Sequence, residues 1–122
     1  MTHRPGTLAI HAGQSPDPST GAVMTPIYAT STYAQDAPGI HRGYEYSRTG
    51  NPTRAALEEA LASLEGAGAD GGAVATASGM AAASLVGYLL KPGEHILLPD
   101  DAYGGTFRFF SRGLAEHGIA WS

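Results

Sequence analysis

From residue 51 onward, the sequence alternates segments of helical periodicity with short apolar segments of strand length. The first helix is expected over residues 52–65, because Asn51 is a good N-cap and Pro52 suits the first helical turn. Further helices are expected over residues 80–90 and 106–117, and strands over residues 73–77, 95–98 and 119–121. Helices and strands in alternation are typical of a sheet covered by helices, so the sequence predicts an α/β fold with a mostly parallel sheet.

Residues 1–50 lack this regularity. Prolines and glycines predict turns at residues 15–21 and 37–39, and the β-branched and aromatic residues of 27–33 favour an extended backbone. We therefore predict an irregular arm over residues 1–50, which lies on another part of the protein or on a partner chain. The first part of the α/β domain is then expected over residues 51–122.

Composition excludes several classes of function. Hydrophobic residues make up 43% of the chain, which is typical of a globular protein. The net charge is -4 and the basic residues are scattered, which argues against nucleic-acid binding. The chain has no cysteine, and its five histidines lack metal-ligand spacing, so no metal site is expected. The sequence shows neither a signal peptide nor an apolar run of the roughly 20 residues that span a bilayer, so a cytoplasmic protein without membrane contact is expected.

The last expected strand, residues 119–121, begins where the sequence ends. A parallel strand needs a crossover connection and neighbouring strands. The domain is therefore expected to be incomplete over these residues. Its unpaired apolar edge predicts poor solubility for the segment in isolation.

The junction before the second helix is the first candidate binding site. A helix N-terminus offers unpaired N–H groups and a partial positive charge, which suit a phosphate group. Gly79 lacks the Cβ that would block close approach, and Ser78 can add a hydroxyl donor. Small residues at such a junction also serve packing alone, and the glycine spacing fits neither a Walker loop nor a dinucleotide-binding fingerprint. Both the binding and the packing interpretation stay open on this pattern.

Two further segments carry candidate residues. Arg48 is able to make a bidentate contact with phosphate and Tyr46 to donate a second hydrogen bond, although an exposed loop arginine is the simpler interpretation. The loop over residues 100–105 follows a strand, where open α/β sheets bind ligands. Tyr103 in this loop is suited to stack on a flat aromatic ligand, or else packs on its own domain.

Taken together, these segments resemble the Cys/Met-metabolism family of enzymes that depend on pyridoxal 5'-phosphate (PLP). The matching segments are YEYSRTGNPTRAALEEALASLEG, ASGMAA, DDAYGGTFR and the arm segment HAGQSPDPSTGAVMTPIYATSTYAQ. The resemblance runs from about residue 7 to residue 122, with the motifs in the family's order. It implies the start of the large PLP-binding domain of a fold-type I, aspartate aminotransferase-like enzyme, preceded by the arm.

The resemblance also implies roles for particular residues. Gly79 and Met80 would donate backbone N–H groups to the PLP phosphate, with Ser78 beside them. Tyr103 would stack on the pyridine ring and take part in proton handling. The remaining roles fall to Tyr46 and Arg48, which would reach the phosphate of a neighbouring subunit's cofactor, and to Arg108, which would hold the distal polar end of the substrate. Such enzymes are usually homotetramers built from two tight dimers, and the arm belongs to that contact.

The resemblance favours cystathionine γ-synthase, which joins an activated homoserine to cysteine. Cystathionine γ-lyase, which cleaves cystathionine to cysteine, 2-oxobutanoate and ammonia, is the close alternative. Methionine γ-lyases typically carry cysteine two residues after the stacking tyrosine, where this chain has Gly105. Outside catalysis, the sequence also leaves open a phosphate-binding fragment and an α/β interaction module.

The only lysine, Lys91, lies in a turn that matches a structural position of the family. PLP catalysis needs a lysine that bonds to the cofactor. We therefore expect an active enzyme for the full protein and no activity for these 122 residues alone.

Overall fold

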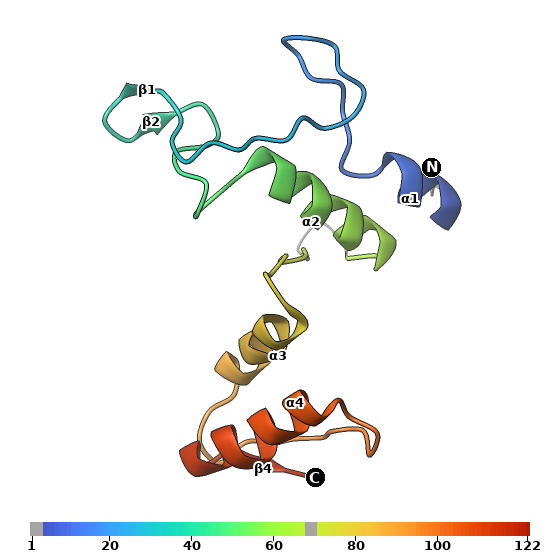
Figure 1. Ribbon diagram of the computed structural model, residues 1–122, viewed down its shortest axis with the longest axis vertical. Helices are drawn as coiled ribbons and strands as arrows, with labels where there is room; N and C mark the ends of the chain where they lie inside the picture. Colours follow the sequence, from blue (N-terminus) through green and yellow to red (C-terminus); the bar gives the residue numbers. More distant parts are fainter. Residues whose placement is uncertain (1–3, 68–70) are drawn as a thin grey trace. The chain divides into compact units, whose positions relative to one another are not determined.

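The computed structural model describes residues 4–67 and 71–122, which fall into two compact units, Met1–Ala75 and Thr76–Ser122 (Figure 1). The first unit contains helices α1 (Pro5–His11) and α2 (Pro52–Leu64) and strands β1 (Gln35–Ala37) and β2 (Ile40–His41). The second unit contains helices α3 (Gly79–Tyr88) and α4 (Gly104–Arg108) and strands β3 (His95–Ile96) and β4 (Ala120–Trp121). None of the described helices is long and apolar enough to cross a membrane.

Helix α2 confirms the first expected helix to within one residue at its end. The side chain of Asn51 caps its start, accepting hydrogen bonds from the N–H groups of Thr53 at 2.9 Å and Arg54 at 3.4 Å. After the C-cap residue Glu65, Gly66 turns the chain away with a φ of 67°. The local signals in the sequence were therefore sufficient to place this helix.

The arm holds a short helix that the sequence did not predict. Helix α1 begins at Pro5, a favoured residue for a first turn, and packs against α2. The chain then passes very close to α2 at Gly13, whose φ is 71°. A Cβ on Gly13 would lie only 2.1 Å from the carbonyl oxygen of Ala56. The first unit therefore needs glycine at this position.

Hydrogen bonds join the rest of the arm to the start of α2. Thr53 Oγ1 donates to the carbonyl of Pro26 at 2.9 Å and accepts from the N–H of Tyr28 at 2.9 Å. Asn51 Nδ2 donates to the carbonyl of Tyr28 at 2.9 Å.

The predicted turn at residues 37–39 is confirmed, and it joins β1 to β2 in an antiparallel hairpin. The turn at residues 15–21 is also confirmed, because the carboxylate of Asp17 accepts hydrogen bonds from the N–H groups of Ser19 and Thr20.

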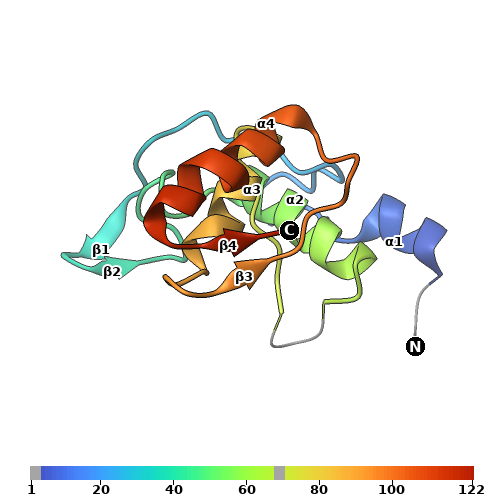
Figure 2. The ribbon, with the colours of Figure 1, turned by 90° about the horizontal axis from the view of Figure 1, so that it is seen from below.

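The second unit contains a parallel strand pair and a long helical segment. Strands β3 and β4 pair in parallel through His95 with Ala120 and Ile96 with Trp121 (Figure 2). The expected third helix is present but begins earlier, at Gly104. It continues from α4 through a π-helical turn (Phe109–Leu114) into a 3-10 turn (Ala115–His117). Among the described side chains, the buried apolar ones of this unit are Phe110 and Ile119.

Two strand predictions were wrong: one expected strand does not form, and another is shorter than expected. Residues 73–77 form no strand, because no other described segment of the chain pairs with their backbone. The strand expected over 95–98 is limited to β3, and Leu97 beyond it is 77% exposed rather than buried. A strand of a parallel sheet is buried only where helices and further strands cover it. Helix α3 also ends at Tyr88, two residues before the predicted end.

The compact units divide the chain at a different point from the predicted arm and domain. Helix α2 lies in the same unit as the arm, because α1, Gly13 and the residues around Tyr28 all contact it. The division at residue 50 stays a prediction for the full protein.

Candidate functional site

The start of α3 presents free backbone donors. Ser78 is extended, with φ of -161° and ψ of 160°, and its Oγ accepts from the N–H of Ala81 at 3.1 Å. Among the described residues, the N–H groups of Gly79 and Met80 have no acceptor. The Ser78 hydroxyl acts as acceptor in the cap, so its hydrogen is still available to donate. This helix end can therefore offer donors to an anion.

Gly79 has open space beside it within the described residues. A Cβ built on Gly79 would meet no described atom within 4 Å. Helix packing within this unit therefore does not require a glycine here. The close approach of α3 to the following helical segment lies at Gly87 instead, where a Cβ would be 2.9 Å from a methyl carbon of Leu114.

The ring of Tyr103 lies beside this helix end. Tyr103 immediately precedes α4 and is 73% exposed. A Cβ on Gly105 would lie 2.6 Å from Cε1 of Tyr103 and 3.2 Å from Sδ of Met80, so both side chains border Gly105. Thr106 Oγ1 also contacts Met80 Sδ, at 3.7 Å. An exposed aromatic ring next to free N–H donors suits a planar ligand that carries a phosphate group.

Replacement of Gly105 by alanine is expected to displace the Tyr103 ring, because the added methyl group would overlap it. In the full-length protein, loaded with the PLP that the sequence resemblance implies, we expect a change in the visible circular dichroism of the cofactor. Gly104→Ala is the matched control, since a Cβ there meets no described atom within 4 Å. Equal effects of the two substitutions would show that the ring contact does not matter.

The other candidate residues lie apart from this group along the chain. Arg108 is exposed in the last turn of α4 and forms no ion pair with a described residue. Tyr46 and Arg48 belong to the first unit, where the guanidinium carbon of Arg48 lies 5.0 Å from the centroid of the Tyr46 ring. Arg48 is exposed, which both interpretations of the sequence allow. Lys91 is exposed in the turn after α3, at the opposite end of that helix from Gly79.

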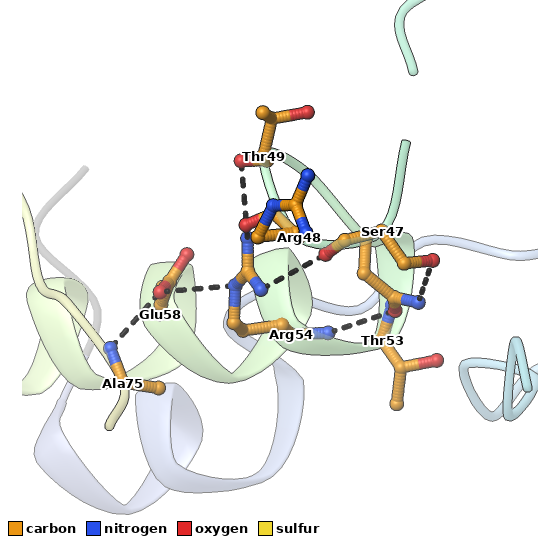
Figure 3. Close-up of polar contacts among 8 residues, drawn as sticks. Ser47, Arg48, Thr49, Thr53, Arg54, Glu58 and Ala75 are labelled. Atoms are coloured by element: carbon orange, nitrogen blue, oxygen red, sulfur yellow. Dashed lines mark hydrogen bonds and ion pairs between the residues drawn. The ribbon is translucent and has the colours of Figure 1, made fainter. Parts of the chain in front are cut away.

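Arg54 was not among the functional residues predicted from the sequence. The guanidinium of this residue donates to main-chain carbonyl oxygens of the turn that carries Arg48, and Glu58 pairs with it (Figure 3). The sequence signal was an arginine and a glutamate one helical turn apart, which also suits an ordinary surface pair. Within the described part of the chain, no group of acidic residues and histidines is arranged to hold a metal ion.

Comparison with known proteins agrees with a site for a phosphorylated planar cofactor. The family model described as "Cys/Met metabolism PLP-dependent enzyme" matches residues 6–122. A probable cystathionine gamma-synthase of Herpetosiphon aurantiacus is 54% identical over 115 residues, which cover 94% of this chain and 35% of that protein. A cystathionine beta-lyase of Coxiella burnetii is 60% identical over 104 residues, which cover 85% of this chain and 26% of that protein.

The fold is also found in solved structures. The structure of metB from Corynebacterium glutamicum matches with a TM-score of 0.90 and 47% sequence identity, over 99% of this chain and 31% of that one. The fold is therefore that of the N-terminal portion of a fold-type I, PLP-dependent enzyme. The chain belongs to the Cys/Met metabolism family of PLP-dependent enzymes. It spans about a third or less of the length of these relatives.

Proposed function

We propose that the full protein is a PLP-dependent cystathionine γ-synthase, which replaces the γ-substituent of an O-acyl-homoserine with cysteine. The observation that carries this proposal is the 54% identity to a probable cystathionine gamma-synthase across 94% of the chain. The free N–H groups at the start of α3 and the Tyr103 ring beside them support the same cofactor.

The residues of the second unit fit PLP. Gly79 and Met80 donate N–H groups to its phosphate, and the positive end of α3 offsets the phosphate charge. Ser78 adds its hydroxyl hydrogen. Bound PLP supplies an electron sink for the substrate. Tyr103 would cover the face of the pyridine ring and exclude water, and its hydroxyl would hold or move a proton. Arg108 pairs with the distal polar end of the amino-acid substrate.

The residues of the first unit serve a shared active site. We infer that the protein is a homo-oligomer, a dimer of dimers, in which Tyr46 and Arg48 donate to the phosphate of the cofactor in the neighbouring subunit. The exposure of Arg48 supports this role, because its guanidinium is not consumed by an ion pair with a described residue. An aromatic ring beneath the guanidinium limits its orientations.

Lys91 does not serve as the lysine that bonds to the cofactor. Helix α3 spans ten residues, so its two ends lie roughly 15 Å apart at 1.5 Å per residue. Lys91 follows one end, and the phosphate donors lie at the other. We therefore propose that the 122-residue segment is inactive by itself. The isolated segment mixed with PLP should turn over neither O-acyl-homoserine with cysteine nor cystathionine, and measurable turnover of either would contradict the proposal.

A cystathionine lyase is the second candidate. The Coxiella burnetii relative, at 60% identity, is named a cystathionine beta-lyase, and the resemblance to γ-lyases rests on the same motifs. A non-catalytic phosphate-binding module is less consistent with the exposed ring of Tyr103, which a phosphate alone does not need.

The deciding experiment uses the full-length protein reconstituted with PLP. One reaction contains O-succinyl- or O-acetyl-homoserine with cysteine, and the other contains cystathionine alone. Net formation of cystathionine in the first reaction, at a higher kcat/KM than cleavage in the second, is expected. Dominant release of pyruvate or of 2-oxobutanoate from cystathionine would instead identify a β-lyase or a γ-lyase.

A further inference from the structure

Arg54 binds the backbone of the turn that carries Tyr46 and Arg48. Its Nη1 donates to the carbonyl of Ser47 at 3.1 Å, and its Nη2 donates to the carbonyl of Thr49 at 3.1 Å (Figure 3). A longer contact of 3.4 Å joins Nη2 to the carbonyl of Arg48 itself. One guanidinium therefore contacts three consecutive carbonyl oxygens.

Glu58 holds the guanidinium from the other side. Its Oε1 lies 3.6 Å from Nε of Arg54, one helical turn away on α2, and accepts the N–H of Ala75 at 2.9 Å (Figure 3). The Arg54 and Glu58 side chains are only 34% and 25% exposed. The ion pair between Arg42 and Asp36 differs, since those side chains are 76% and 52% exposed. Because it is less exposed, the Arg54 pair is less screened by solvent than the Arg42 pair.

The geometry requires an arginine. A guanidinium presents five N–H donors in a rigid plane, and this plane can serve separate carbonyls and a carboxylate together. A lysine ammonium is a compact charge on a flexible stem and cannot span the same acceptors. The turn has its own hydrogen bonds as well, from the N–H groups of Thr49 and Gly50 to the carbonyl of Tyr46. Arg54 adds the contacts that fix the peptide groups on either side of Arg48.

We propose that Arg54 is a positioning residue for PLP binding, which orients the Tyr46–Arg48 turn toward the phosphate, and that Glu58 fixes the Arg54 guanidinium. The inference rests on the proposed function, because it assumes that Tyr46 and Arg48 contact the phosphate. Arg54 itself touches neither cofactor nor substrate. Its effect passes through the backbone of residues 47–49.

The test measures the apparent Kd of full-length apoprotein for PLP, by quenching of intrinsic fluorescence. Arg54→Lys is expected to raise this Kd by about 10-fold, the effect of losing hydrogen bonds from a charged donor. Glu58→Gln keeps an acceptor for the N–H of Ala75 but loses the ion pair, and a rise of a few-fold is expected. Arg42→Lys is the matched control, because Arg42 pairs with an exposed aspartate. The Kd of this variant for PLP should equal that of the wild-type protein.

A double substitution separates positioning from general destabilisation. If Arg54 acts through Arg48, adding Arg54→Lys to an Arg48→Met protein should produce little further rise in Kd. A full additional rise in that background would overturn the inference, as would a wild-type Kd for Arg54→Lys. Should Arg54→Lys fail to fold, Glu58→Gln is tested in the same two backgrounds. If Arg48→Met leaves the Kd for PLP unchanged, the proposed contact of Arg48 with the phosphate is contradicted. If Arg48→Met raises the Kd and Arg54→Lys does not, only the positioning role of Arg54 is contradicted.

Discussion

Replacement of Gly79 by proline is expected to weaken PLP binding by the full-length protein roughly 10- to 100-fold relative to Gly79→Ala. Proline removes the N–H at the first position of α3, which has no acceptor among the described residues. The helix itself should tolerate the change, since proline is favoured at this position. Ser78 before it is extended, as a residue preceding proline prefers.

Alanine is the matched control because both replacements add a Cβ at the same place. That Cβ meets no described atom within 4 Å, so the alanine replacement should not disturb the packing of the second unit. The measurement is the apparent Kd for PLP, together with far-ultraviolet circular dichroism to verify that the helices persist. Equal Kd values for the proline and alanine proteins would show that the Gly79 N–H does not bind the phosphate.

Replacement of Gly13 by alanine is expected to detach the end of α1 from α2. The φ of 71° at Gly13 costs an L-residue about 1–2 kcal/mol. The new Cβ would in addition lie 2.1 Å from a backbone oxygen of α2, which no side-chain rotation can relieve. We expect a local loss of about 3 kcal/mol or more in total.

Gly21→Ala is a control that strains the backbone of the arm without a contact to α2. Gly21 has nearly the same φ, 73°, but a Cβ there meets no described atom within 4 Å. Amide hydrogen exchange of the full-length protein reports the result in peptides that cover residues 5–14. Exchange there should accelerate by roughly 100-fold in Gly13→Ala, and should be unchanged in Gly21→Ala, which strains a different turn. Similar exchange in both proteins would contradict the close approach to α2.

The sequence predicted the elements that local interactions determine. Helix α2 was predicted nearly to the residue, because Asn51, Pro52 and the leucine spacing act within the segment itself. Residues 73–77 have the composition of a strand, but a strand also needs a hydrogen-bonding partner that its own residues cannot specify. Helix α1 was missed because a short helix is stabilised by its contact with α2 rather than by its own periodicity.

The site could be predicted to a similar extent. Ser78, Gly79 and Met80 stand at a helix start that the sequence itself marks. The position of the Tyr103 ring beside Gly105 and Met80 depends on how α4 packs, so only the family resemblance indicated that these residues lie together. The role of Arg54 depends on the direction of three carbonyl groups in a turn, which residue identities do not reveal.

The contacts of Arg54 have a consequence for how such a protein can diverge. Arg54 recognises main-chain oxygens, so it constrains the path of residues 47–49 but not the chemistry of their side chains. Mutations in the turn can therefore change which groups are presented to a ligand while the supporting frame stays intact. A library randomised at residues 47–49 with Arg54 retained should yield far more folded variants with altered ligand preference than one in which Arg54 varies too.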